Sequence, residues 1–475
     1  MRRRIAIIGG GITGLAAANR LLELDPAIEI MLLDRSDRLG GVLQTTRQDG
    51  FLLEGAADGF LATPPWALDF CRRIGCSVVP TDAPRPRAFV VHRGRLQPVP
   101  PGFVVMAPRR LRPVLSSPLL SVRGKLRIAL EPFVPARHGR GDESIASFVR
   151  RRFGREVYDH LVQPLVGGIY SGDPETLSLE ATMPRFREME RKHGSLLRAM
   201  WEQPTCTPSA EPSGARYGQF VAPRAGMSDL VEGAARCLAP RSIRLNSPVA
   251  AVRPLEGGRW RLEVQGDAPG FVTANGLILA APAFESARLL APLAPAAAKN
   301  LRDVSYAGCA IVSLGYRREQ VGHPLDGLGF VVPRVEDRLI LSCSFSSAKY
   351  PGRAPEGEVL LRVFIGGAHQ GHLLALSEAE LVELARLELT DLLGLRGDPL
   401  LAHVSRRSAA MPQYQVGHCE RVRQITSDLE RFPSLVLAGS GLFGVGIPHC
   451  IRSGEEAAGR VLRAARPQRE LAAAV

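Results

Sequence analysis

Residues 5–34, IAIIGGGITGLAAANRLLELDPAIEIMLLD, decide the fold of this chain. The apolar run at 5–8 predicts a strand, and the three glycines that follow it predict a tight turn. Small and apolar residues at 15–22 predict a helix, and a second apolar run at 28–33 ends on Asp34. Strand, glycine turn, helix, strand and acid together predict a βαβ unit that binds a dinucleotide.

Each glycine of this turn has its own physical role in that hypothesis. Gly9 allows the tight turn, Gly11 lets backbone approach a pyrophosphate, and Gly14 lets the helix pack closely on the strand. The pyrophosphate would lie at the helix N-terminus, where unpaired N–H groups and the dipole favour an anion, and Asp34 would accept hydrogen bonds from a ribose. A glycine turn without a ligand is the alternative, and the flanking elements disfavour it. The predicted contacts are Gly9, Gly10, Gly11, Ile12, Thr13, Gly14 and Asp34.

The residues DRSDRLGG at 34–41 select the dinucleotide. They resemble the signature of FAD-binding oxidoreductases, in which an acid is followed by an Arg and then by two glycines. In that family the Arg and the second Gly lie along the FAD diphosphate, which implies this role for Arg38 and Gly41, with Arg35 as a further candidate contact. The resemblance favours FAD over NAD. The alternative is a solvated turn with an unused Arg.

Length and composition limit the class of protein. A chain of 475 residues is longer than one core normally serves, so we expect two or three domains. It carries 60 basic and 47 acidic residues, which gives a net charge of +13. A basic surface suits ligands with carboxylates or phosphates, or an anionic membrane face. We expect no nucleic-acid partner. The eight Cys form no C-x-x-C pair and no Cys/His cluster with zinc spacing, which predicts no metal site and reduced thiols in the cytoplasm. No apolar run approaches the ~18–20 residues that span a bilayer.

The order of strand and helix patterns predicts an α/β protein whose FAD domain is discontinuous in sequence. Strands late in the chain are expected to return to the first sheet, and helical periodicity replaces strand alternation from about residue 101 to 200. The predicted division is a Rossmann-like FAD-binding domain at 1–85, 217–290 and 405–475, a mixed substrate-binding sheet at 86–100 and 291–404, and an inserted helical domain at 101–216.

The helical stretch is basic as well as apolar. Between Pro108 and Phe133, Arg and Lys alternate with Leu and Val, and a basic amphipathic segment of this kind can lie on an anionic membrane. The alternative is the solvated face of an ordinary helical domain. The expected location is therefore the cytoplasm, with a candidate peripheral contact to the inner membrane face.

A second glycine motif, GSGLFGVGIPHCI at 439–451, follows a predicted strand and precedes a predicted helix. The start of that helix, if it lay near a flavin ring, would stabilise the anion on the pyrimidine side of the reduced flavin. The additional cofactor contacts predicted are Val249, Gly439, Gly444, Val445, Gly446 and Ile447.

Three motifs carry a closer resemblance. They are PLVGGIYSGDP at 164–174, ERKHGSLL at 190–197 and GVGIPHCI at 444–451. With the FAD signature, they resemble the oxygen-dependent protoporphyrinogen oxidases and their bacterial coproporphyrinogen III oxidase relatives, from Ile5 to Leu462. The resemblance implies FAD-dependent oxidation of a porphyrinogen to a porphyrin in haem biosynthesis, with O2 as acceptor. It does not choose between protoporphyrinogen and coproporphyrinogen, and a homodimer is a further expectation.

The resemblance also implies substrate contacts. Gly168 falls where backbone approaches the substrate in this family. Phe330 and Phe364 fall where the family's residues line an apolar slot for the substrate, and ordinary core packing is the alternative for each Phe. Arg87 is a candidate for holding a propionate, although the family's Arg aligns with Ala88. A further departure is EGAA at 54–57, where the family often has an acid followed by Gly-Pro. No catalytic acid or base is identified, because the flavin does the chemistry.

Two rival functions remain open. The first is another flavin oxidase acting on amines or carotenoids, but amine oxidases usually bring two aromatic residues to the flavin near the C-terminal motif, and here only Phe443 is nearby. The second is a non-catalytic FAD- or tetrapyrrole-binding protein. The rapid reduction of the flavin by a porphyrinogen without oxygen would separate them.

Overall fold

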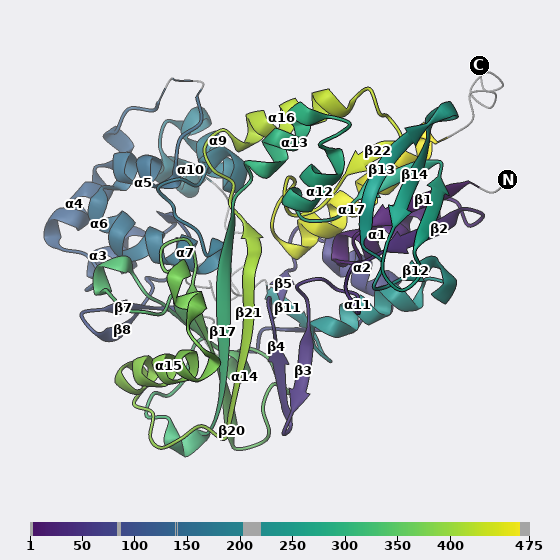
Figure 1. The fold of residues 1–475 in the computed structure, drawn as a ribbon. Helices are drawn as coiled ribbons and strands as arrows, with labels where there is room; N and C mark the ends of the chain where they lie inside the picture. Colours follow the sequence, from purple (N-terminus) through teal and green to yellow (C-terminus); the bar gives the residue numbers. More distant parts are fainter. Residues whose placement is uncertain (1–2, 83–86, 138, 140, 203–219, 466–475) are drawn as a thin grey trace.

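The computed structural model describes residues 3–82, 87–137, 139, 141–202 and 220–465. Figure 1 shows a parallel sheet with its helices on one side of the molecule, a long-stranded second sheet in the middle, and a cluster of helices on the other side. The predicted α/β architecture is confirmed. The division into domains at particular residue numbers stays a prediction, and its boundary at 216/217 lies outside the described residues.

The first sheet brings together strands that are far apart in sequence. It has five parallel strands in the order β12 (Ile243–Arg244), β2 (Glu29–Leu33), β1 (Arg4–Ile8), β16 (Gly276–Leu279) and β22 (Leu435–Leu437). Both faces of such a sheet must be covered, because successive side chains point to opposite faces and nearly all are apolar. The sheet is therefore assembled from the beginning, middle and end of the chain, as a discontinuous domain requires.

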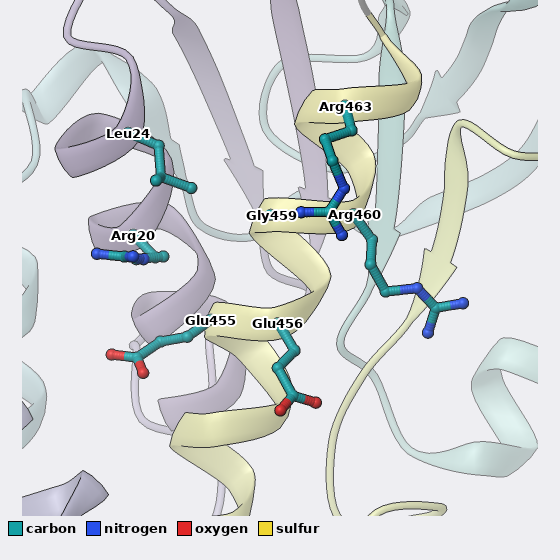
Figure 2. Close-up of a pocket in the computed structure, with 7 residues that line it drawn as sticks. All are labelled: Arg20, Leu24, Glu455, Glu456, Gly459, Arg460 and Arg463. Carbon is teal, nitrogen blue, oxygen red and sulfur yellow. The ribbon is translucent and has the colours of Figure 1, made fainter.

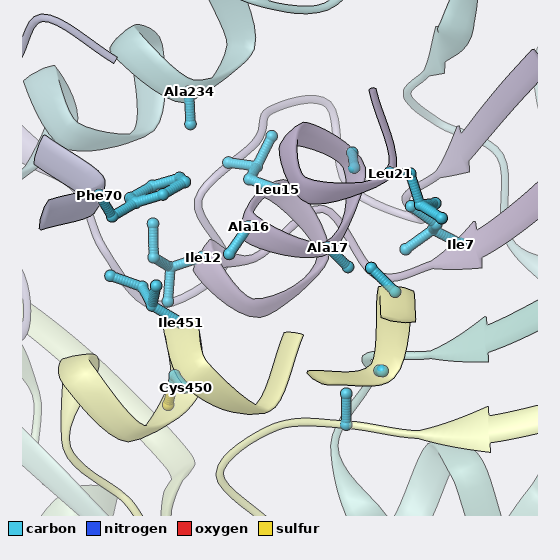
Figure 3. Close-up of a cluster of buried hydrophobic side chains, with 14 of the residues drawn as sticks. Ile7, Ile12, Leu15, Ala16, Ala17, Leu21, Phe70, Ala234, Cys450 and Ile451 are labelled. Carbon is cyan, nitrogen blue, oxygen red and sulfur yellow. The ribbon is translucent and has the colours of Figure 1, made fainter. Parts of the chain in front are cut away.

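One face is covered by helices that include α1 (Ile12–Leu24) and α17 (Ile447–Ala464), with α2 (Trp66–Arg73) and α11 (Met227–Arg236). Figure 3 shows the core between them, where Leu15, Phe70 and Ile451 meet. The contact between α1 and α17 depends on small residues, since a Cβ at Gly454 would lie 2.2 Å from the Thr13 carbonyl oxygen. The first and last helices of the described chain are thus locked together.

The opposite face carries a small antiparallel sheet and three helices. The strands are β13 (Val249–Leu255), β14 (Arg259–Val264) and β15 (Gly270–Ala274), and the helices are α12 (Ala283–Leu290), α13 (Pro295–Arg302) and α16 (His418–Leu429). Helix α13 packs in this core, although the predicted boundary at 290/291 assigned it to the substrate domain.

The second sheet has seven strands in the order β21 (Leu401–Pro412), β17 (Tyr306–Arg317), β20 (Glu358–Gly366), β19 (Ser342–Phe345), β18 (Gly329–Val331), β7 (Phe89–His92) and β8 (Arg95–Pro98). It is mixed, because β18 and β7 run parallel and the other pairs antiparallel. Helix α15 (Glu378–Leu393) covers one face, opened by a capping box of Ser377 and Glu380. Strand β21 continues past the predicted boundary at 404/405.

Shorter elements join the two sheets. They are the hairpin of β3 (Thr45–Gln48) and β4 (Phe51–Glu54), and the three-stranded sheet of β5 (Phe60–Leu61), β11 (Phe220–Pro223) and β6 (Val78–Pro80). The loop between β4 and β5 reaches the second sheet, where Arg362 of β20 donates to the Glu54 carbonyl oxygen at 2.9 Å.

The helical region has its own apolar core. Its helices are α3 (Leu111–Ser116), α4 (Val122–Ala129), α5 (Ile145–Phe153), α6 (Arg155–Val157), the π-helix η2 (Tyr158–Val162), α7 (Gln163–Tyr170), α8 (Leu179–Thr182), α9 (Pro184–His193) and α10 (Leu196–Glu202). Across the part of the chain that the structure describes, no helix combines the length and apolar character needed to cross a membrane.

The ERKHGSLL motif has a structural role in this region. The fully buried Glu131 carboxylate accepts hydrogen bonds from Ser195 Oγ at 2.5 Å and from the backbone N–H groups of Leu196 and Leu197, so it caps α10. Arg152, also fully buried, ion-pairs with Glu131 at 2.5 Å and donates to the Gly194 carbonyl oxygen. The motif therefore fixes the turn between α9 and α10.

Candidate functional site

The turn between β1 and α1 has the geometry that its glycines predict. Gly9 has a φ of +109°, which favours glycine, and a Cβ at Gly14 would lie 1.9 Å from the Gly9 carbonyl oxygen. A Cβ at Gly11 would meet nothing within 4 Å, so the backbone there is open to a ligand. Helix α1 begins at Ile12 with no side-chain cap and no acid in its first turn. Its N–H groups are left for an anion.

Asp34 closes this turn from the end of β2. Its carboxylate accepts from the N–H of Gly10 at 2.6 Å and from the N–H of Ser36 at 2.7 Å. The group is half-exposed, and a carboxylate has further lone pairs for a ribose hydroxyl. The Asp34 carbonyl oxygen accepts from the N–H of Ser247, which leads into Val249 at the start of β13. The side chain of Val249 is buried, so only its backbone could contact a ligand.

The FAD-signature loop lies against the same turn. The N–H of Gly40 donates to the Gly10 carbonyl oxygen, and a Cβ at Gly41 would lie 3.6 Å from Gly11 Cα. Arg38 donates to the carbonyl oxygens of Leu39, Gly41 and Leu43, which holds its guanidinium inside the loop.

The turn at 9–14, Asp34 and the loop at 38–41 together form what we call the cofactor cradle, and Arg35 does not join it. Its side chain is 62% exposed and ion-pairs with Glu285 at 2.8 Å. Arg35 therefore links this loop to α12 at the protein surface, and the structure gives no support to its predicted cofactor contact.

The C-terminal motif meets the first one. Gly439 has a φ of +113°, its N–H donates to Ser453 Oγ at 2.8 Å, and a Cβ there would lie 3.6 Å from Thr13 Oγ1. Gly444, with a φ of +109°, donates to the Tyr414 hydroxyl at 2.7 Å. Tyr414 in turn donates to the Ser440 carbonyl oxygen, which pins the loop.

Helix α17 follows, and its N-terminus lacks a side-chain cap, as that of α1 does. It begins at Ile447 after Gly446, with no side-chain cap and no acid in the first turn, and Val445 precedes them in the loop. The residues present fit a dinucleotide, because an open glycine turn, two uncapped helix starts and a carboxylate at the end of β2 belong to one end of the parallel sheet.

A row of side chains crosses the second sheet on the face opposite α15. Residues paired in neighbouring strands point to the same face of a sheet. The row runs through Ser405, Ile311, Phe364, Ser342 and Val331. At one end Ser405 Oγ donates to the Gly55 carbonyl oxygen at 3.0 Å, and at the other a Cβ at Gly168 would lie 3.1 Å from Val331 Cγ1. This face therefore extends from the β4–β5 loop to helix α7, and Phe364 and Gly168 both belong to it.

The structure does not bring Phe330 to this face. Phe330 pairs with Cys343 and packs against Phe345, with ring centroids 6.1 Å apart, in the core beneath α15. Its neighbour Val331 faces Gly168 instead. This position gives no support to the predicted role of Phe330 in lining the substrate slot. Strand side chains alternate between the two faces, and the apolar run at 330–332 gives no sign of which residue faces which side.

Arg87 is also engaged elsewhere. Its guanidinium ion-pairs with the Asp326 carboxylate, donates to the Asp326 carbonyl oxygen at 3.2 Å and lies over the Phe89 ring. An Arg already paired with a carboxylate is poorly placed to hold a propionate, so the structure does not support the predicted clamp.

A buried group of charges beneath the β4–β5 loop was not predicted. Asp58 ion-pairs with Lys349 at 2.9 Å and with Arg362 at 3.1 Å. Burial alone would raise the pKa of Asp58, but the charges of Lys349 and Arg362 outweigh it and hold the pKa at about 2. Burial raises the pKa of Glu54, which accepts from the Met227 N–H and from Thr45 Oγ1. These contacts fix the loop where the sequence EGAA departs from the expected pattern.

A surface hollow of about 390 Å³ lies elsewhere, between the C-terminal halves of α1 and α17 (Figure 2). Its lining residues are Arg20, Leu24, Glu455, Glu456, Gly459, Arg460 and Arg463. Leu24 is roughly 18 Å along α1 from Ile12, at a rise of about 1.5 Å per residue, so this hollow is separate from the glycine turn.

The fold and this cradle define a class: an FAD-dependent oxidoreductase with a separate substrate sheet. The chain belongs to the flavin-containing amine oxidoreductase family, whose model matches residues 12–462. Within that class it groups with the porphyrinogen oxidases. It is 32% identical to coproporphyrinogen III oxidase of Bacillus subtilis, over 96% of this chain and 97% of that protein. It is 30% identical to chloroplastic protoporphyrinogen oxidase 1 of Arabidopsis thaliana, over 95% of this chain and 86% of that protein.

A solved structure agrees with this placement. The crystal structure of a candidate protoporphyrinogen oxidase from Exiguobacterium sp. 255-15 superposes with a TM-score of 0.85, at 31% identity, over 97% of this chain and 98% of that one. The predicted cofactor, FAD, is confirmed at the level of the family. Which residues contact it stays a prediction.

Proposed function

We propose that this protein oxidises a porphyrinogen to a porphyrin in haem biosynthesis, with FAD as the electron acceptor and O2 as the final oxidant. The observation that carries the proposal is the full-length similarity to relatives named for this reaction. The row of small and apolar side chains between the β4–β5 loop and Gly168 supports it, since a flat macrocycle needs an extended, largely uncharged surface beside the cofactor.

The number of electrons removed sets the number of flavin cycles and of O2 molecules that each porphyrinogen requires. Aromatising a porphyrinogen removes six electrons and six protons, so ~three two-electron steps and about three O2 molecules, each reduced to H2O2, are needed. Bound FAD would supply the two-electron chemistry. The chain's own task is to hold the macrocycle flat against the sheet, with Phe364 and Val331 as apolar contacts and Gly168 leaving room for it.

Coproporphyrinogen III is the first substrate to test, because three relatives named coproporphyrinogen III oxidase are 30–32% identical over at least 96% of this chain. Protoporphyrinogen IX is the second, supported by the plant relatives. The decisive experiment mixes the FAD-loaded protein with each porphyrinogen without oxygen and follows the visible flavin absorbance. We expect rapid bleaching with one or both, then porphyrin fluorescence and H2O2 once oxygen is admitted. If the protein binds FAD and porphyrin but neither porphyrinogen bleaches the flavin absorbance, the oxidase proposal is wrong and the protein is a carrier.

We also propose that the helical region contacts an anionic membrane. Val122, Leu126 and Phe133 are 82%, 59% and 77% exposed and follow one another along α4 and the turn after it. Arg123 and Lys125 lie among them, so apolar and basic side chains share one surface.

Vesicle sedimentation tests the membrane contact. The double variant Val122→Glu, Phe133→Glu should bind phosphatidylglycerol vesicles at least roughly tenfold more weakly than the native chain, because burying each apolar side chain contributes about 1.5–3 kcal/mol. Phe271→Glu, on the distant strand β15 and 69% exposed, is the matched control and should bind like the native chain. Equal binding by both variants would contradict the proposal. The same samples, studied by analytical ultracentrifugation, would show whether this surface joins two copies of the chain in a homodimer instead.

A further inference from the structure

Arg407, on β21, points from the second sheet toward Gln44, three residues after Gly41 of the FAD-signature loop. It pairs with Cys309 and lies two residues from Ser405, so it shares the face that meets the β4–β5 loop. One Nη donates to Gln44 Oε1 at 2.9 Å, and a Cβ at Gly55 would lie 3.4 Å from that nitrogen. The Nε is buried without a hydrogen-bond partner. An arginine donor in this state is costly unless a ligand completes it.

A second guanidinium lies close by. Arg38 donates to the carbonyl oxygen of Leu43, and Arg407 holds the side chain of the next residue, Gln44. Burial lowers the pKa of Arg407, and the charge of Arg38 lowers it further. Among the residues that the structure describes, neither arginine has a carboxylate within 4.0 Å. Arg38 also donates to the Gly41 carbonyl oxygen beside the open glycine turn, and two like charges near such a turn are the arrangement that an anion stabilises.

We propose that Arg407 is a second cation for the FAD diphosphate, reaching it from the substrate sheet opposite Arg38. The proposal rests on FAD as the cofactor and adds a residue that lies outside every glycine motif. Its consequence is a physical link between the domains. FAD binding would fix strand β21, and with it the row of side chains that begins at Ser405, in the position needed for the substrate.

The test uses the apoprotein and no porphyrinogen, so its failure differs from a failure of the oxidase function. FAD is titrated into the native chain and into Arg407→Gln, Arg407→Lys and Arg406→Gln while the flavin fluorescence is followed. Riboflavin, which lacks the diphosphate, is titrated in parallel. Arg406 is the matched control, because it is exposed on the opposite face and donates to the Leu376 carbonyl oxygen.

We expect Arg407→Gln to weaken FAD binding roughly tenfold or more, as loss of a charge-assisted hydrogen bond does, and to leave riboflavin binding unchanged. Arg407→Lys should recover part of the affinity, and Arg406→Gln should bind like the native chain. An FAD affinity for Arg407→Gln within about twofold of native, or an equal loss for FAD and riboflavin, would overturn the proposal. Unchanged FAD affinity with a raised KM for a porphyrinogen would overturn it too, and would assign Arg407 to a substrate carboxylate. Matching circular dichroism of the apoproteins excludes misfolding as the cause.

Discussion

Gly168 lies near the end of α7, is exposed, and faces Val331 of strand β18 in the second sheet. A Cβ there already meets Val331 Cγ1 at 3.1 Å, and Val331 ends the row that runs through Ser342 and Phe364, so a larger side chain at residue 168 would crowd this end of the row. Whatever binds on this face is therefore limited by the size of residue 168.

Gly168→Leu should abolish turnover of a porphyrinogen while the visible spectrum of bound FAD stays unchanged, because the leucine fills the substrate face and not the cofactor cradle. Gly168→Ala should give an intermediate rate. Gly167→Ala is the control in the same helix, since its Cβ would make an ordinary 3.5 Å contact with Gln163. The measurement is the steady-state rate together with the flavin absorbance. Full activity in Gly168→Leu would remove Gly168 from the site.

Asp58 gives a prediction for the dependence of stability on pH. Its folded pKa of about 2 lies below the ordinary value of 3.8, so its ion pairs stabilise the fold above about pH 4 and this stabilisation is lost as the pH falls toward 2. Asp58→Asn should lower the free energy of unfolding by about 3–5 kcal/mol at pH 7, because Lys349 and Arg362 lose their partner. The difference between native and variant should shrink in urea titrations at about pH 3. A difference that stays constant with pH would contradict the ion-pair explanation.

At the scale of elements, the buried Glu131–Arg152 pair joins η1 (Glu131–Phe133), α5 and α10. Glu131→Gln should destabilise the helical region by about 3–5 kcal/mol, since the buried Arg152 would keep a single carboxylate partner, Glu190, at the longer distance of 3.5 Å. Glu188→Gln, which breaks an exposed and solvent-screened pair with Lys192 on α9, should leave the free energy of unfolding close to that of the native chain. Urea unfolding of both variants measures the difference. Equal effects would mean that burial does not distinguish these pairs.

Elements whose determinants are local could be predicted from the sequence. The glycine turn after the first strand and the glycine motif at 439–451, between a strand and a helix, each depend on a few adjacent residues, and the structure has both. What could not be predicted depends on distant partners. Arg87 is taken by Asp326 and Arg407 meets Gln44, which are 239 and 363 residues away in sequence, and the face of Phe330 depends on which side α15 covers.

At the scale of the whole molecule, the parallel sheet makes the two ends of the chain interdependent. β1 and α1 come from the beginning, β22 and α17 from the end, and both uncapped helix starts belong to the same cradle. A ligand held by both should stabilise the assembled sheet as a unit, because it cannot bind a state in which either end is released.

FAD should therefore raise the unfolding temperature of the whole FAD domain and slow the proteolysis of α17. At free FAD near a hundred times its dissociation constant, the stabilisation should approach about 2.7 kcal/mol. The measurement is a thermal melt of the apoprotein at increasing FAD, with limited proteolysis followed by mass spectrometry to locate the cleavages. NAD is the control ligand and should shift neither readout, because the Arg38–Gly41 extension favours FAD. Protection of α1 alone, with α17 cleaved as fast as in the apoprotein, would show that the C-terminal helix start does not hold the cofactor.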